Sequence, residues 1–322
     1  MTDLFRIGTY NVENLFDRFD DPYATGDDMY GRFRTMPKSR SKLFDMGRRI
    51  RENGVDGRPI DIVALQEIEN FGSLLDFVQS SVGPDYGPKL GVISQPSNDP
   101  RGIDLGLITT RRFRLGRVIS HRFHKFPRAD GKLYQFGRDC LQVEILDDDR
   151  EELILTAFIC HFKSKYTGID PFKNPTDYEK AQQNNDLKRQ AESEEVKRII
   201  ENTLDPDTAR YAVLGDLNDT PDSMPLAPLA GADNTLGLVN ALTLLPQDDL
   251  SAHSETRRPR DTHVWGRPQE GGGRKDEWAQ IDYILCSPAL WALNTGVANV
   301  INSPKNQGSD HYLSYAEFEM PE

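Results

Sequence analysis

Apolar residues occur along the chain in short, nearly continuous runs rather than in strict alternation with polar residues. Such runs are typical of β-strands buried on both faces, because successive strand side chains point to opposite sides. We expect the following runs to be strands: LFRIGTYNV (4–12), DIVALQEI (61–68), LGLITT (105–110), CLQVEIL (140–146), LILTAFICHF (153–162), YAVLGDLN (211–218), IDYILC (281–286) and YLSYAEFE (312–319).

Helical periodicity occurs between the expected strands. The clearest helix is expected at 176–204, where Thr176 and Glu179 have the spacing of a capping box. One of its faces is partly apolar and suited to packing on a sheet: Leu187, Ala191, Val196, Ile199 and Ile200. Shorter helices are expected at 39–53 and 73–82. The mixture predicts an α/β protein in which sheet layers are covered by helices.

The connecting segments predict one domain. The chain has 322 residues, and neither an internal repeat nor a long Pro/Gly linker divides it. We therefore expect a single domain over residues 1–322. Segment 247–279 is long, polar and rich in glycine, which predicts a loop that is functional or mobile. Residues 17–38 are also expected to be irregular.

Charge is distributed unevenly. The formal net charge of −12 argues against a strong general attraction to a polyanion. Residues 111–128 nevertheless contain seven Lys/Arg, two His and three Phe, and no Asp or Glu. This run is either a solvated strand face or a rim that faces phosphates, with phenylalanines available for base stacking. The sequence leaves both interpretations open.

Cysteine usage and hydropathy indicate the compartment. Cys140, Cys160 and Cys286 lie in apolar runs and match no zinc motif, so we expect buried, reduced thiols in a reducing compartment. The sequence shows no secretory signal and no apolar run of the roughly 20 residues that a membrane-spanning helix requires. We expect a soluble, cytoplasmic protein, most simply a monomer.

Polar residues of a few kinds stand where many of the expected strands begin or end. They are Asn11, Glu13, Glu67, His161, Asp216, Asn218, Asp282, Asp310 and His311. Each one alone has an ordinary explanation, because Asn at a strand end is usually a turn residue and a lone His beside a strand is usually structural. Taken together, they match the way α/β enzymes assemble a site from several strand ends.

The side-chain types limit the chemistry of such a site. Glu and Asp oxygens suit Mg²⁺ or Mn²⁺. Two histidines and an Asp-x-Asn pair suit the activation of water and the stabilisation of a charged, five-coordinate phosphorus. The sequence contains no GxSxG, Walker A or HExxH motif, which removes the main rival nucleophile and nucleotide motifs.

The ordered motifs resemble the endonuclease/exonuclease/phosphatase superfamily, which includes deoxyribonucleases, apurinic/apyrimidinic endonucleases, sphingomyelinases and inositol polyphosphate 5-phosphatases. The resemblance spans nearly the whole chain through TYNVENLFD (9–17), LQEIEN (65–70), RGIDLGLI (101–108), CHFKSK (160–165), GDLND (215–219), IDYIL (281–285) and SDH (309–311). It implies a four-layer α/β sandwich with two central, mostly antiparallel sheets, helices outside, and the site at one edge.

The resemblance also implies roles for individual residues. The divalent metal, Mg²⁺ or Mn²⁺, is expected on Glu67 and Asp310, with Asn11 close by and Glu13 where some branches carry an Asp. His311 is expected to act as general base or transition-state stabiliser. The remaining implied roles are Asp282 orienting His311, Asp216 orienting or deprotonating the attacking water, and Asn218 holding a phosphoryl oxygen.

His161 matches the deoxyribonuclease and phosphatase branches, whereas the apurinic/apyrimidinic endonuclease branch usually has tyrosine. It is expected to bind a phosphate oxygen or assist the leaving group, with Asp104 as its carboxylate partner. The candidate phosphate contacts are Arg101, Lys163 and Lys165. The alternative interpretation is that these three residues are ordinary surface cations.

Three functions remain at this point. The first is a metal-dependent nuclease that hydrolyses DNA phosphodiesters without a covalent intermediate. The second is a phosphatase or phosphodiesterase for small molecules or lipid head groups, such as inositol phosphates or sphingomyelin, which the acidic balance favours because nucleic-acid affinity rests largely on phosphate neutralisation. The third is a non-catalytic binding module on the same fold, which the complete set of site residues disfavours.

Overall fold

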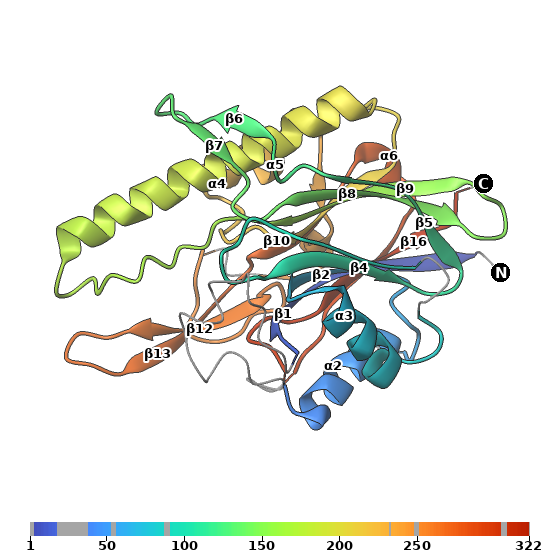
Figure 1. Cartoon of the computed structure of the whole chain (residues 1–322), viewed down its shortest axis with the longest axis horizontal. Coiled ribbons are helices and arrows are strands. Elements are labelled where there is room, and N and C mark those ends of the chain that lie inside the picture. The colour runs from blue at the N-terminus through green and yellow to red at the C-terminus, as the bar shows by residue number, and fades with distance from the viewer. Residues whose placement is uncertain are drawn as a thin grey trace.

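Two six-stranded sheets form the centre of the molecule (Figure 1). The computed structural model describes residues 3–17, 38–52, 56–86, 91–231, 233–247, 251–303 and 308–321, so most of the expected irregular segment 17–38 lies outside the described residues. The first sheet has, in spatial order, β15 (Asn294–Val300), β16 (Ser314–Glu319), β1 (Leu4–Leu15), β2 (Ile62–Ile68), β4 (Asp104–Thr109) and β3 (Val92–Gln95).

The second sheet repeats the same arrangement. Its strands are, in spatial order, β11 (Val239–Asn240), β14 (Asp282–Cys286), β10 (Tyr211–Asp216), β9 (Leu153–His161), β8 (Cys140–Asp147) and β5 (Phe113–Ser120). In each sheet one central pair is parallel, β1 with β2 and β9 with β10, and the other pairs are antiparallel. Each parallel pair brings two strand ends to the same edge of its sheet.

Helices cover the outer faces of both sheets (Figure 1). The helices α2 (Arg40–Glu52) and α3 (Phe71–Phe77), the latter continued by the π-helix η2 (Val78–Val82), lie against the first sheet. The long helix α4 (Pro175–Thr203) lies against the second. The remaining helical segments are short: η3 (Met224–Leu226), α5 (Ala227–Ala230), η4 (Ala241–Leu244) and α6 (Pro288–Trp291).

Alternate residues of a single strand fill different layers of the core. In β9, Leu155, Ala157 and Ile159 belong to the apolar cluster between the two sheets. Phe158 and Cys160 belong to the cluster between the second sheet and α4. This two-sided burial explains the nearly continuous apolar runs and confirms the expected four-layer α/β sandwich. All three cysteines are free and buried, as expected.

Two of the expected local structures are wrong. Helix α4 begins at Pro175 after Asn174, and no side chain caps it, so Thr176 and Glu179 form no capping box. Proline fits the first helical turn because its fixed φ suits the helix and its missing N–H has no partner to lose. The expected loop 247–279 contains the hairpin of β12 (His263–Pro268) and β13 (Arg274–Ala279), which projects from the sheets (Figure 1).

A smaller hairpin, β6 (Lys125–Pro127) with β7 (Leu133–Gln135), packs near α4. The basic run 111–128 forms β5 and leads into this hairpin. Four of its seven Lys/Arg pair with acids of the chain itself: Arg112 with Asp3, Arg117 with Glu144, Arg114 with Glu151 and Arg128 with Asp130. The structure therefore favours the solvated strand face. No described helix has the length and apolar character to cross a lipid bilayer.

Candidate active site

Strand register brings several of the predicted site residues together. Asp216, the last residue of β10, is directly opposite His161 on β9 and Asp282 on β14. Directly opposed residues point to the same face of a sheet. Asn11 of β1, in the other sheet, donates from Nδ2 to Asp216 Oδ2 over 3.1 Å. The site therefore lies where the adjoining edges of the two sheets meet.

The backbone departs from regular strand geometry at this edge. Register shifts occur in β1 between Asn11 and Leu15, and in β2 between Gln66 and Ile68. Of the five described non-glycine residues with positive φ, four belong to the site region: Glu13 (48°), Asn14 (56°), Glu67 (66°) and Asn218 (55°). Left-handed backbone costs such residues about 1–3 kcal/mol each, and it is concentrated where side chains must be re-aimed for function.

Hydrogen bonds hold this irregular backbone in place. Glu13 N donates to Asn11 Oδ1 over 3.0 Å, and Asn14 N donates to Glu67 Oε2 over 3.1 Å. Asn218 N donates to Asp216 Oδ1 over 2.9 Å. The bulges in β1 and β2 are thus tied to each other through Glu67, one of the predicted metal ligands.

Helix α4 anchors the loops that follow β9 and β10. Arg189 is fully buried and pairs with Asp219 over 3.0 Å, while it also donates to Lys163 O over 2.9 Å. The equally buried Glu192 accepts from Lys163 N over 2.8 Å. Because buried charges are costly unless paired, these contacts fix the helix relative to the two strand ends.

Three predicted metal-binding carboxylates influence one another. Burial raises the pKa of Glu13, and the nearby Asp310 and Glu67 raise it further, while Lys38 opposes this from 3.6 Å. Neighbouring carboxylates repel each other unless a cation lies between them. The oxygen ligands of Glu13, Glu67 and Asp310 suit a hard divalent cation such as Mg²⁺ or Mn²⁺ by their chemistry. Among the described residues, the groups whose ligand atoms lie within 4.8 Å of one another are His263 with Asp310 and His311, and Asp216 with Asp282 and His311.

His311 and Asp282 form a buried pair. His311 Nδ1 lies 2.8 Å from Asp282 Oδ2, and both side chains are at least nine-tenths buried. The segment is fixed by Ser309, whose Oγ donates to Asn11 O and accepts from His311 N. Burial lowers the pKa of His311, but the carboxylates of Asp282 and Asp216 outweigh it and hold that pKa well above the usual value.

Asp216 lies at the centre of the site. Its Oδ2 is 3.6 Å from His161 Nε2 and 3.8 Å from His311 Nε2. Burial raises the pKa of Asp216 to about 7, and the charge of His311 offsets part of this effect. A carboxylate surrounded by two imidazoles and an amide is placed to exchange a proton with a water molecule.

Asp104 is not the partner of His161. Its Oδ1 accepts from Ser97 N over 2.7 Å, whereas His161 Nδ1 is buried and has no hydrogen-bond partner within the described part of the chain. Burial raises the pKa of Asp104 to about 7. Burial, together with Arg138 and Arg101, lowers the pKa of His161 well below its usual value. His161 thus lacks a carboxylate partner at Nδ1, which differs from the expected His–Asp pair.

The predicted phosphate contacts have different surroundings. Arg101 and Arg138 both pair with the buried Asp99, over 3.0 and 2.8 Å. Lys165 pairs with Asp219 over 2.6 Å. Asn218 Nδ2 donates to Phe162 O over 3.0 Å. One cavity is lined by Arg101, Arg138, Lys165 and Asn218. Asp104 and Lys163 do not line it.

That cavity has a volume of about 880 Å³, and two further segments line it beside the predicted site residues. The loop between β9 and α4 contributes Tyr166 and Phe172, which are 74% and 51% exposed. The β12–β13 hairpin contributes Trp265 and, among other residues, Arg267. None of the cations in the run 111–128 lines it. The inner part of the cavity is thus lined by polar residues of the predicted site, and the outer part by aromatic and cationic side chains.

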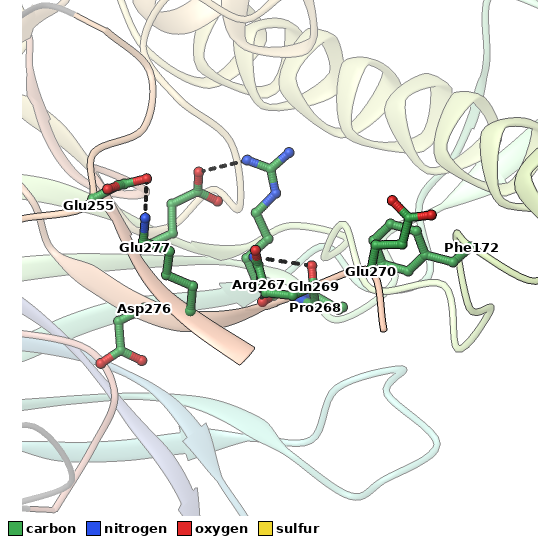
Figure 2. Close-up of a pocket in the computed structure, with 9 residues that line it drawn as sticks. Phe172, Glu255, Arg267, Pro268, Gln269, Glu270, Asp276 and Glu277 are labelled. Carbon is green, nitrogen blue, oxygen red and sulfur yellow. Dashed lines mark hydrogen bonds and ion pairs between the residues drawn. The ribbon is translucent and has the colours of Figure 1, made fainter. Parts of the chain in front are cut away.

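A smaller cavity of about 290 Å³ lies along the outer part of the same hairpin (Figure 2). Figure 2 shows Glu270 beside Phe172, and Glu277 joined to Arg267. Four of its nine lining residues are acidic: Glu255, Glu270, Asp276 and Glu277. Arg267 and Lys275 also line it, so acids outnumber cations by two, and the larger cavity is the better candidate for a phosphate substrate.

Sequence reasoning missed several residues of this site, namely Lys38, Arg138, Tyr166, His263 and Trp265. His263 Nε2 lies 3.4 Å from Asp310 Oδ2. Burial raises the pKa of Asp310, but the contact with His263 and the charge of His311 outweigh it and lower the pKa overall. The one available signal was the position of THVW shortly before the IDYIL strand, inside a segment interpreted as a loop.

Comparison with known proteins identifies the class in agreement with this geometry. The endonuclease/exonuclease/phosphatase family matches residues 6–252. The chain therefore belongs to this family, whose members are hydrolases of phosphate esters. No curated protein sequence matches the chain.

Solved structures show the same fold at low sequence identity. The human Nocturnin catalytic domain with bound sulfate is 16% identical, with a TM-score of 0.56 and coverage of 100% of this chain and 96% of that one. TDP2 from D. rerio, complexed with single-strand DNA product, is 14% identical, with a TM-score of 0.56 and coverage of 98% and 99%. An endonuclease/exonuclease/phosphatase from Bacteroides vulgatus is 15% identical, with a TM-score of 0.55 and coverage of 99% of both chains.

Proposed function

We propose that the protein is a divalent-metal-dependent phosphodiesterase that cleaves DNA, with a preference for flexible single strands. The supporting observation is that one cavity contains both the histidines and carboxylates of the site and the exposed rings of Tyr166 and Phe172. Unpaired bases stack on such rings irrespective of sequence, and arginine and lysine pair with the phosphates between them. The complex of TDP2 with single-strand DNA product is consistent with this substrate class.

The metal is assigned to the carboxylate cluster. Glu67 and Asp310 would hold the cation, with Asn11 and Glu13 beside them, and the cation would supply positive charge against the phosphoryl oxygens. Lys38, close to Glu13, contributes charge of the same sign. The assignment explains why three carboxylates share one part of the site.

The remaining residues act on water and on phosphate. Asp216 orients the attacking water and accepts its proton, and His311, held by Asp282, stabilises charge on the phosphorane. His161 and Asn218 donate to phosphoryl oxygens. Water attacks phosphorus directly as the P–O bond to the leaving nucleotide breaks, so we expect inversion at a chiral phosphate. Retention would require a covalent intermediate and would contradict this mechanism.

The first test uses the metal-free full-length protein with a labelled single-stranded oligonucleotide and a supercoiled plasmid. We expect cleavage on addition of Mg²⁺ or Mn²⁺, none in EDTA, and none by His311→Ala, whose melting temperature serves as the folding control. A clean preparation that is inert on DNA and RNA with either metal would refute the nuclease assignment.

A small phosphate ester is the second candidate substrate. It is favoured by the carboxylate partners of the cavity cations, Asp99, Asp219 and Glu277, because each of them weakens attraction to a polyanion. A panel of inositol phosphates, sphingomyelin and nucleotides separates the candidates. Turnover of one of these compounds by a protein that leaves DNA intact would establish the second function in place of the first.

A further inference from the structure

His263, the first residue of β12, connects the hairpin to the site. Its ring stacks nearly parallel on Trp265, with centroids 5.4 Å apart and planes at 13°. The ring of His311 is the second aromatic neighbour of His263, with centroids 4.2 Å apart. His263 is therefore held by aromatic neighbours from the hairpin and from the catalytic segment.

The backbone around His263 is fixed to the segment that carries Asp310. Val264 N donates to Asp310 O over 3.1 Å, and Tyr312 N donates to Thr262 O over 2.7 Å. Between these two bonds His263 and His311 form an isolated antiparallel bridge. The side chains of His263 and Asp310 consequently keep a defined relative position.

The side-chain contact acts on one oxygen of Asp310. His263 Nε2 lies 3.4 Å from Oδ2, while Oδ1 lies 3.9 Å from His311 Nε2. The Asp310 side chain is 35% exposed, so burial alone does not restrain its rotation. A donor that holds one carboxylate oxygen orders the other oxygen for ligation, as outer donors do for metal-binding carboxylates generally.

We propose that His263 is a positioning residue that orders Asp310 as a ligand of the divalent cation. This inference rests on the metal assignment in the proposed function, but not on the identity of the phosphate ester. Nε2 of His263 contacts Oδ2 of Asp310, and the ring of His263 is kept in place by Trp265. The hairpin that borders the substrate cavity is thereby linked to the metal-binding carboxylates.

The test measures Mn²⁺ binding by calorimetry to the metal-free full-length protein, without substrate. His263→Phe keeps the ring and removes the donor, and we expect its dissociation constant to rise about tenfold or more. His263→Gln places an amide N–H near the position of Nε2, and we expect it to restore most of the affinity. Lys275→Ala is the matched hairpin control, since Lys275 pairs with Glu255 away from the site, and its affinity should equal that of wild type.

A double-mutant cycle keeps the test decisive. In an Asp310→Asn background, His263→Phe should cause no further loss, because the carboxylate it orders is already gone. Additive losses, unchanged affinity in His263→Phe, or a Gln variant as weak as the Phe variant would each overturn the proposal. The calorimetry is repeated with Co²⁺ and Mg²⁺. If His263→Phe lowers the affinity for Co²⁺ but not for Mg²⁺, the proposal is also overturned, because that result would indicate direct ligation by the imidazole. Failure of wild type to bind Mn²⁺ would instead refute the metal assignment itself.

Discussion

The contact between Asp282 and His311 is the most direct single-residue test of the mechanism. Asp282→Asn keeps the shape but removes the charge that holds the His311 imidazole in its orientation and raises its pKa. We expect kcat to fall by about 100-fold or more, with little change in KM, because acid–base and electrostatic assistance are lost in the transition state. Steady-state kinetics on a labelled oligonucleotide measure the effect. A large rise in KM at constant kcat would assign Asp282 to ground-state binding.

The buried carboxylate of Asp104 makes a prediction about stability. Burial raises its pKa to about 7, so the folded state binds this proton more tightly than the unfolded state does. Stability from this group is therefore present at low pH and is lost as the pH rises from about 4 through 7. Asp104→Asn removes the ionisation while its side-chain oxygen still accepts from Ser97 N. Relative to wild type, we expect the variant to gain of the order of 1–3 kcal/mol between pH 5 and pH 8.

Urea unfolding of both proteins at these two pH values measures that difference. Asp139, whose pKa burial raises to about 6, remains in both proteins, but its charge also raises the pKa of Asp104, so the measured difference includes the interaction between the two carboxylates. A gain of equal size at pH 5 and pH 8 would show that the effect comes from packing and not from ionisation.

At the scale of single residues, sequence motifs predicted the site residues that lie at strand ends but not those that lie on other elements. Asp216, Asp282 and His311 are close together because strand pairing and a short motif fix them. Arg138 and His263 reach the site from a loop and a hairpin, and no local pattern encodes that approach. Asp104 was misassigned because its carboxylate accepts a hydrogen bond from the backbone N–H of Ser97, which the spacing of RGID does not reveal.

At the scale of elements, the two walls of the cavity carry the expected substrate preference. Tyr166 lies in the loop before α4, and Trp265 lies on the hairpin. Because Trp265 already stacks on His263, bases are expected on the exposed rings of the loop, and Tyr166→Ala and Phe172→Ala should each raise KM for a single-stranded oligonucleotide by about fivefold or more. Hydrolysis of bis(p-nitrophenyl) phosphate, which has no bases, tests the chemistry separately and should be unaffected by Tyr166→Ala. Phe123→Ala is the matched control, because Phe123 is 70% exposed and does not line the cavity.

The elements themselves were predictable where burial determines them. The central strands follow from nearly continuous apolar runs, because each is covered on both faces. The hairpin of β12 and β13 could not be predicted in this way, since its residues are mostly half-buried or exposed and its sequence is polar and glycine-rich. The start of α4 was misplaced because Pro175 begins the helix without a side-chain cap.

At the scale of the whole molecule, the distribution of charge distinguishes a binding site confined to the cavity from one that extends over the surface. The net charge is −12, and the basic run of β5 pairs with acids of its own sheet or of neighbouring segments. Nucleic acid is therefore expected to meet positive charge mainly inside the cavity. Its lining cations are Arg101, Arg138, Lys165, Arg267 and Arg274.

This distribution predicts a weak dependence of binding on salt. For single strands, log K falls with log salt by about 0.7 for each phosphate neutralised, so five cations allow a slope of at most about −3.5. Because Asp99, Asp219 and Glu277 already pair with most of them, we expect a shallower slope. Fluorescence anisotropy of a labelled oligonucleotide with the Asp282→Asn protein measures it, and Arg274→Ala should reduce the slope by about 0.7. A slope of about −5 or steeper would require phosphate contacts beyond the cavity and would return residues 111–128 to the binding surface.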